Sequence, residues 1–86
     1  MKIAYTPAFV RQFNALPNEL QEEVLEKTKL FKNKENHKML KVHKLHGRFA
    51  SRYGFSIDYK NRIVFGYLTK DEVVFLAVGD HDIYNK

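Results

Sequence analysis

Hydrophobic and polar residues in the first third of the chain follow the spacing of one short strand and two helices. Lys2 to Tyr5 alternates polar and apolar residues, which is typical of a strand. Thr6 and Pro7 then place a hydroxyl at a helix N-cap and a proline at the first helical position, where its missing N–H costs nothing. Apolar residues recur at helical spacing as far as Pro17, and again from Leu20 to Phe31. We therefore predict a strand followed by a helical hairpin with both apolar stripes directed into a core.

From Phe49 onward the pattern changes to the two-residue period of β-strands. Aromatic and aliphatic residues occupy one parity up to Tyr59, and Arg52, Ser56 and Asp58 occupy the other. The predicted strands and turns run in the order 49–59, a turn at 60–61, 62–69, a turn at 69–71, and 72–79. The second half of the chain therefore predicts an antiparallel meander.

Together these elements predict an α+β fold in the order β-α-α-β-β-β, with the helical hairpin packed on one face of a twisted antiparallel sheet. A chain of 86 residues is expected to form one domain, residues 1–86. It has no cysteine, so its stability must come from packing and not from disulfides. No apolar run approaches the ~18–20 residues that cross a bilayer, and the N-terminus lacks the apolar stretch of a signal peptide. We expect a cytoplasmic protein without a membrane partner, whose open sheet face is available for function.

The net charge of +5 is concentrated in one stretch of the chain. Between Lys27 and Arg48 there are eight basic residues and one acidic residue, Glu35. Part of this charge supports the second helix, because acidic residues precede basic ones along it and Glu23–Lys27 is an i,i+4 pair. The remaining basic residues lie beyond that helix, in a region predicted as a long loop with a short strand near residues 39–45, and are Lys38, Lys41, Lys44 and Arg48. They indicate attraction to a nucleic acid or to an acidic protein partner.

The chain has no general motif for phosphate-loop, nucleophile-elbow or zinc chemistry. His43 and His46 are three residues apart, but no carboxylate lies near them in the sequence, so we expect neither a metal site nor a cofactor. His37 and His43 are interpreted as surface histidines. Chemistry is better sought among the residues of the predicted sheet.

A second set of polar residues could meet at one edge of that sheet. Its members are Arg52, Ser56, Arg62, His81 and, beyond them, Tyr84. Arginine binds phosphate and stabilises a pentavalent transition state, while histidine exchanges a proton near neutral pH. The arginines could instead pair with Asp58 or Asp71, and Tyr84 could anchor the C-terminus in the core. The residues alone therefore indicate an anion or RNA site.

The second half of the chain resembles the RelE/ParE superfamily of toxins from type II toxin–antitoxin systems. The residues that carry the resemblance are Leu45, Gly47, Arg52-Tyr53, Arg62-Ile63-Val64-Phe65, Gly79-Asp80-His81 and Tyr84. The strand, helix and LPNELQEEV segment of the first half are similar to the usual opening of the family, so the resemblance covers essentially the whole chain. It implies a RelE-like microbial RNase fold, in line with the pattern of elements.

The resemblance also implies an activity. Members similar to RelE, YoeB and YafQ cleave messenger RNA on the ribosome: the 2′-hydroxyl attacks the phosphate without a metal and leaves a 2′,3′-cyclic phosphate. By this resemblance His81 is the proton donor, Arg62 contacts the scissile phosphate, and Arg52 occupies a recurrent basic position. His46 lies near a loop histidine of YafQ-like enzymes, and Tyr84 belongs to the same C-terminal motif. The basic residues beyond the second helix would bind the RNA backbone. The implied partners are mRNA, the ribosome and an acidic antitoxin, with a monomeric toxin inside a hetero-oligomeric complex.

The chain departs from the YafQ and YoeB patterns at the general base. YafQ-like enzymes have a second histidine where Ser56 stands and an Asp-Trp pair where Lys60-Asn61 stands, and the glutamate base of YoeB-like enzymes has no counterpart in residues 40–56. His46 and Asp58 are candidate bases, and Lys44 could act electrostatically. Two other functions stay open: a ParE-like inhibitor of DNA gyrase, and a catalytically weak or non-toxic homologue that binds an antitoxin.

Overall fold

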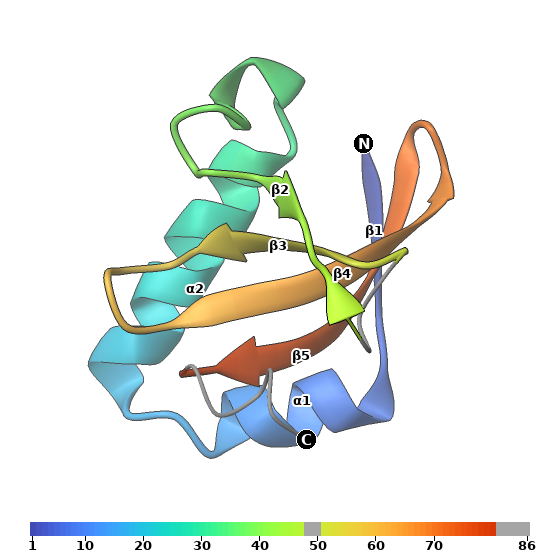
Figure 1. Cartoon of the computed structure of the whole chain (residues 1–86). Helices are drawn as coiled ribbons and strands as arrows, with labels where there is room; N and C mark the ends of the chain where they lie inside the picture. The colour runs from blue at the N-terminus through green and yellow to red at the C-terminus, as the bar shows by residue number, and fades with distance from the viewer. Residues whose placement is uncertain (48–50, 81–86) are drawn as a thin grey trace.

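The computed structural model describes residues 1–47 and 51–80. Its elements are β1 (Lys2–Tyr5), α1 (Pro7–Asn14), α2 (Asn18–Phe31), the 3-10 helix η1 (Lys34–Asn36), β2 (His43–Lys44), β3 (Tyr53–Ser56), β4 (Arg62–Thr69) and β5 (Glu72–Gly79). The strands form one sheet in the order β1-β5-β4-β3-β2, and α2 lies behind it in Figure 1. The predicted α+β class is confirmed, with two helices packed on a mostly antiparallel sheet.

The sheet differs from the predicted meander at both of its edges. β1 pairs in parallel with β5, from Lys2 opposite Glu72 to Tyr5 opposite Phe75. At the other edge, the short strand predicted near residues 39–45 is present as β2, and its antiparallel pairing with β3, with His43 opposite Gly54, adds a strand to the meander. The β3 strand is also shorter than the predicted 49–59, because residues 57–61 form the turn into β4. The pairing of the first strand with the last joins distant segments, and a local pattern cannot show it.

Helix α1 begins where the sequence predicts and is fixed along β5. The Thr6 side-chain oxygen accepts the backbone N–H of Phe9 at 3.1 Å, and Pro7 occupies the first turn. The backbone N–H of Thr6 donates to the Phe75 carbonyl at 3.1 Å, and that of Val78 donates to Gln12 Oε1 at 2.9 Å. These bonds give partners to backbone groups of β5 where its pairing with β1 ends, and they hold α1 beneath the sheet (Figure 1).

The core is built around the aromatic ring of Phe31 at the end of α2. This side chain is fully buried and stacks on Phe55 with ring centroids 4.6 Å apart, and it meets the edges of Phe65 and Phe75. These three phenylalanines come from β3, β4 and β5, so they define the face of the sheet that the helices cover. Residues of the other parity, including Arg52, lie on the opposite face, which we call the open face. No helix of the described residues covers the open face.

His37 is not the surface histidine that the sequence predicts. Its ring is half-buried and stacks on Phe31 with centroids 4.5 Å apart, and its Nε2 lies 2.8 Å from the Phe31 carbonyl oxygen. His43 is exposed, as predicted, with Nδ1 at 2.8 Å from the Lys41 carbonyl oxygen. The charged segment after α2 therefore contributes a ring to the aromatic core, because His37, which follows η1, stacks on Phe31. Within residues 1–47 and 51–80, no helix is long and apolar enough to span a membrane.

Candidate anion-binding site

Arg62 lies at the start of β4, where it is held by the strand before it and the turn between them. In the register of the sheet it stands opposite Ser56 on one side and Gly79 on the other. Its Nη1 donates to the Ser56 hydroxyl at 2.9 Å and to the carbonyl oxygen of Asp58 at 3.2 Å. Both bonds come from Nη1, one of the three guanidinium nitrogens, so they fix the orientation of the guanidinium through that atom. Such a group can present its remaining donors to a phosphate oxygen.

The carboxylate of Asp58 stabilises the same turn and is a poor candidate for the general base. Its Oδ1 accepts the backbone N–H groups of Lys60 at 2.8 Å and Asn61 at 2.7 Å, as well as the Asn61 side-chain amide. Partial burial raises the pKa of Asp58, but these hydrogen bonds and the charge of Arg62 outweigh it, so the pKa lies below its usual value. A carboxylate stabilised as an anion and already bonded to three donors is ill suited to accept a proton.

Arg52 lies on the open face, but it is displaced from Arg62. A Cβ placed on Gly66 would lie 3.7 Å from Arg52 Cδ and 3.8 Å from its Nη1, so the arginine lies across this glycine. Gly66 and Arg62 are four residues apart on β4, which is about 13 Å along the strand. The sheet therefore brings Ser56 and Arg62 together and places Arg52 farther along the same face, and not beside them as the sequence suggested.

Neither aspartate that the sequence offered as a partner forms an ion pair with Arg52 or Arg62. Asp71 pairs with Lys34 at 2.8 Å, and the Asp58 carboxylate is bonded to its own turn. The predicted pair Lys27–Glu23 is present at 3.1 Å on α2. The described residues hold no group of three or more histidine, aspartate and glutamate side chains that could bind a metal ion.

The other predicted site residues lie on the surface or outside the described residues. Lys38, Lys41, Lys44 and His46 are all exposed, in and around β2 at the edge of the sheet. Gly47 adopts a left-handed φ of 71° and turns the chain after His46. Arg48, His81 and Tyr84 fall outside the described residues. Gly79, the last residue of β5, stands opposite Arg62.

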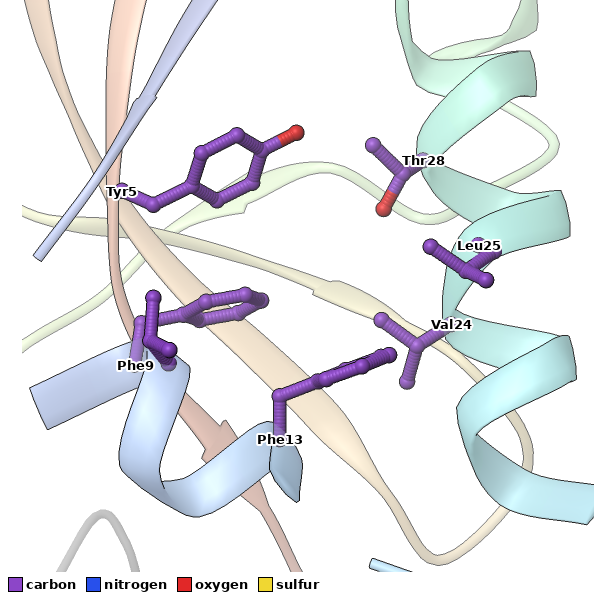
Figure 2. A pocket seen from close by; sticks show the side chains of 7 residues that line it. Tyr5, Phe9, Phe13, Val24, Leu25 and Thr28 are labelled. Carbon is purple, nitrogen blue, oxygen red and sulfur yellow. The ribbon is translucent and has the colours of Figure 1, made fainter. Parts of the chain in front are cut away.

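An apolar hollow of about 170 Å³ lies on the helix side of the sheet. Figure 2 shows Tyr5 from β1, Phe9 and Phe13 from α1, and Val24 and Leu25 from α2 directed toward it. The Tyr5 and Thr28 hydroxyls are the polar side-chain groups of its lining. A lining without cations does not suit a phosphate, so this hollow is not a candidate for the anion site.

Two residues of this region were not singled out from the sequence. The alternation predicts Tyr59 in a strand, at the same parity as Phe55, but it lies in the β3–β4 turn with 90% of its surface exposed. Gly66 was read only as part of a strand, yet it is the surface on which Arg52 rests. Aspartate favours turns, so Asp58 could have indicated that Tyr59 lies in one. The contact between Gly66 and Arg52 depends on the register of two strands, which the sequence does not show.

No protein-family model matches the chain, and no curated protein matches its sequence. Solved structures do match in fold. The RelBE2 toxin–antitoxin complex from Mycobacterium tuberculosis gives a TM-score of 0.72 at 17% identity, over 93% of this chain and 96% of the matched one. The DinJ–YafQ toxin–antitoxin complex from E. coli gives 0.74 at 15% identity, over 95% and 93%. The YoeB–YefM complex from Staphylococcus aureus gives 0.73 at 15% identity, over 94% and 97%. The chain therefore has the fold of the RelE/ParE-like toxin superfamily.

Proposed function

We propose that this chain is the toxin of a type II toxin–antitoxin system and acts as a ribosome-dependent endoribonuclease on mRNA. Its fold is that of toxins solved with their antitoxins, and the observation that carries the proposal is the geometry of Arg62. Ser56 and the Asp58 carbonyl hold this guanidinium at the end of the sheet where β5 leads toward His81. An arginine oriented in this way suits the binding of a phosphodiester and the stabilisation of its transition state.

In the proposed reaction the 2′-oxygen of the substrate attacks the adjacent phosphorus and the bond from phosphorus to the 5′-oxygen breaks. The products are a 2′,3′-cyclic phosphate and a free 5′-hydroxyl. His81 donates the proton that the leaving 5′-oxygen needs, and the 2′-hydroxyl proton passes to a base, for which His46 is the remaining candidate. Arg62 stabilises the charge that grows on the phosphorane oxygens, because preorganised donors act most strongly on charge that develops in the transition state.

Two surfaces complete the proposal. Arg52 and the exposed lysines near β2, Lys38, Lys41 and Lys44, contact the RNA backbone, joined by Arg48. An acidic antitoxin covers part of the same basic region when the toxin is inactive, as opposite charges favour such association. Tyr84, which belongs to the same C-terminal motif, takes part in binding the substrate.

The test is cleavage of an mRNA on purified ribosomes by the full chain, with the ends of the products identified. We expect fragments that end in a 2′,3′-cyclic phosphate. Arg62→Ala and Arg62→Lys should each slow cleavage by a factor of about 100 or more, because lysine lacks the planar fork. His81→Ala should slow it further while ribosome association persists. A wild-type chain that leaves mRNA intact but changes plasmid topology would replace this proposal with gyrase inhibition.

A further inference from the structure

Tyr59 is exposed far more than any other large apolar side chain that the structure describes. It exposes 90% of its surface, while the next values are 61% for Met39 and 60% for Leu25 and Leu68. Single exposed apolar residues are common, so exposure alone assigns no role. The turn that carries Tyr59 adds two observations that together point to a ligand.

The first observation is that hydrogen bonds hold the residues before and after Tyr59 in the chain. The Asp58 carboxylate before it accepts the backbone N–H groups of Lys60 and Asn61 after it, at 2.8 and 2.7 Å. The N–H of Ile57 donates to the Asn61 carbonyl at 2.9 Å and closes the turn. The backbone at Tyr59 is therefore ordered before any ligand arrives. A ligand that stacks on its ring loses little conformational entropy of the chain, which favours binding.

The second observation is that the same turn orients Arg62. The guanidinium donates to the carbonyl oxygen of Asp58, the residue next to Tyr59, at 3.2 Å. The Cα atoms of Tyr59 and Arg62 are separated by three residues and thus by at most about 10 Å. One rigid turn thus carries a planar ring and a fixed cation within the reach of one nucleotide.

Charge around the turn selects the side from which an anionic strand approaches. The turn and the start of α2 line one hollow, formed by Pro17, Glu19, Leu20, Glu23, Asp58 and Asn61. Three of these side chains are carboxylates, which repel phosphate. The cation of Arg62 lies on the open face, where Arg52 also lies. A strand is therefore drawn to the side of Arg62, and the ring of Tyr59, three residues away and 90% exposed, is accessible to a base of that strand.

We propose that Tyr59 is a base-stacking residue for single-stranded RNA, and that it holds the nucleotide next to the phosphate bound by Arg62. The inference rests on the proposed function for the nature of the ligand. Stacking on an aromatic ring tolerates any base and requires unpaired nucleotides. Tyr59 therefore increases the affinity for the strand and fixes its position on the protein, and it contributes little to sequence preference.

The test uses the absence of tryptophan from the chain. Tyr59→Trp gives the full chain a single tryptophan at the turn, and Leu68→Trp, at an exposed position near the other end of β4, is the matched control. The probe is a short single-stranded RNA with 2′-O-methyl riboses, which cannot be cleaved, together with the same strand made abasic. We expect the intact strand to quench the Tyr59→Trp emission, the abasic strand to leave it unchanged, and the control to respond to neither. Tyr59→Leu should weaken binding of the intact strand about tenfold, and Tyr59→Phe should restore it.

Equal quenching by the intact and abasic strands would overturn the inference, as would equal affinity of Tyr59→Leu and the wild type for the intact strand. These outcomes are separable from the nuclease proposal. If wild type and Tyr59→Leu both cleave mRNA equally, the stacking role fails and the nuclease stands. If base-dependent quenching occurs but mRNA stays intact on ribosomes, Tyr59 binds RNA and the nuclease proposal fails.

Discussion

At the scale of single residues, the carboxylate of Asp58 determines the stability of the β3–β4 turn in acid. Burial acts to raise its pKa, yet the hydrogen bonds from Asn61 and Lys60 lower it below the ordinary 3.8. The stabilisation is therefore fully present above about pH 4 and is lost as the pH falls through the lowered pKa. We expect Asp58→Asn to cost about 1 kcal/mol at neutral pH and to flatten the fall of the free energy of unfolding below about pH 4, measured by urea denaturation.

The control for this effect is Glu26→Gln, which removes the same charge from an exposed position on α2. We expect it to leave the acid dependence of stability unchanged. Some acid dependence will persist in Asp58→Asn as well, because the hydrogen bond from Lys34 lowers the pKa of Asp71. A flattening of the same size in both variants would assign the effect to net charge and not to the turn.

Gly66 is predicted to position Arg52 rather than to relieve backbone strain. A methyl group there meets Arg52 and Leu76 at 3.7–3.9 Å, which is ordinary contact, so Gly66→Ala should change the free energy of unfolding by less than about 1 kcal/mol. Gly66→Leu is large enough to displace the arginine. It should weaken binding of 2′-O-methyl RNA as much as Arg52→Ala does, with no further loss in the double variant. Losses that add in the double variant would show that the two residues act independently.

At the scale of elements, the sequence predicted those features of helices and strands that depend on residues close together in the chain. Thr6 caps α1, and Gly79 ends β5, because capping and strand propensity are local. The parity of Arg52 and Ser56 was also correct, since alternation fixes the face of a strand. The parallel pairing of β1 with β5 and the placement of β2 at the edge escaped it. These depend on which distant strands meet, as does the separation of Arg52 from Arg62.

The aromatic centre of the fold gives a direct test of how α2 is held on the sheet. Phe31 contacts rings from β3, β4, β5 and the segment after η1, and its side chain is fully buried. We expect Phe31→Ala to lower the free energy of unfolding by about 3–5 kcal/mol, measured by chemical denaturation. Leu25 of the same helix lines the apolar hollow but keeps 60% of its surface exposed, so Leu25→Ala should cost less than about 1 kcal/mol. Similar losses in the two variants would contradict the assignment of Phe31 as the centre of the core.

At the scale of the whole molecule, charge is sorted between two sides. The acidic residues Glu19 and Glu23 lie at the start of α2 beside the β3–β4 turn, whereas the exposed lysines of the segment around β2 lie at the edge of the sheet. Arg62 and Arg52 lie between them on the open face. If the protein binds RNA as proposed, we expect the strand to cross the open face between β2 and the turn that carries Tyr59.

Salt dependence distinguishes this directed path from a general attraction to a basic protein. The logarithm of the affinity for single-stranded RNA falls with the logarithm of the salt concentration by about 0.7 per phosphate neutralised. Replacing Lys38, Lys41 and Lys44 with glutamine should therefore reduce the slope by about 2 for the 2′-O-methyl RNA, measured by fluorescence anisotropy at several salt concentrations. The matched control replaces Lys27, Lys29 and Lys32, which lie on α2 and at its C-cap, with glutamine and so removes the same charge. Lys27 already pairs with Glu23. The salt slope of this control variant should stay near that of the wild type. Equal reductions in both triple variants would mean that RNA responds to net charge alone, and the path along the edge of the sheet would be wrong.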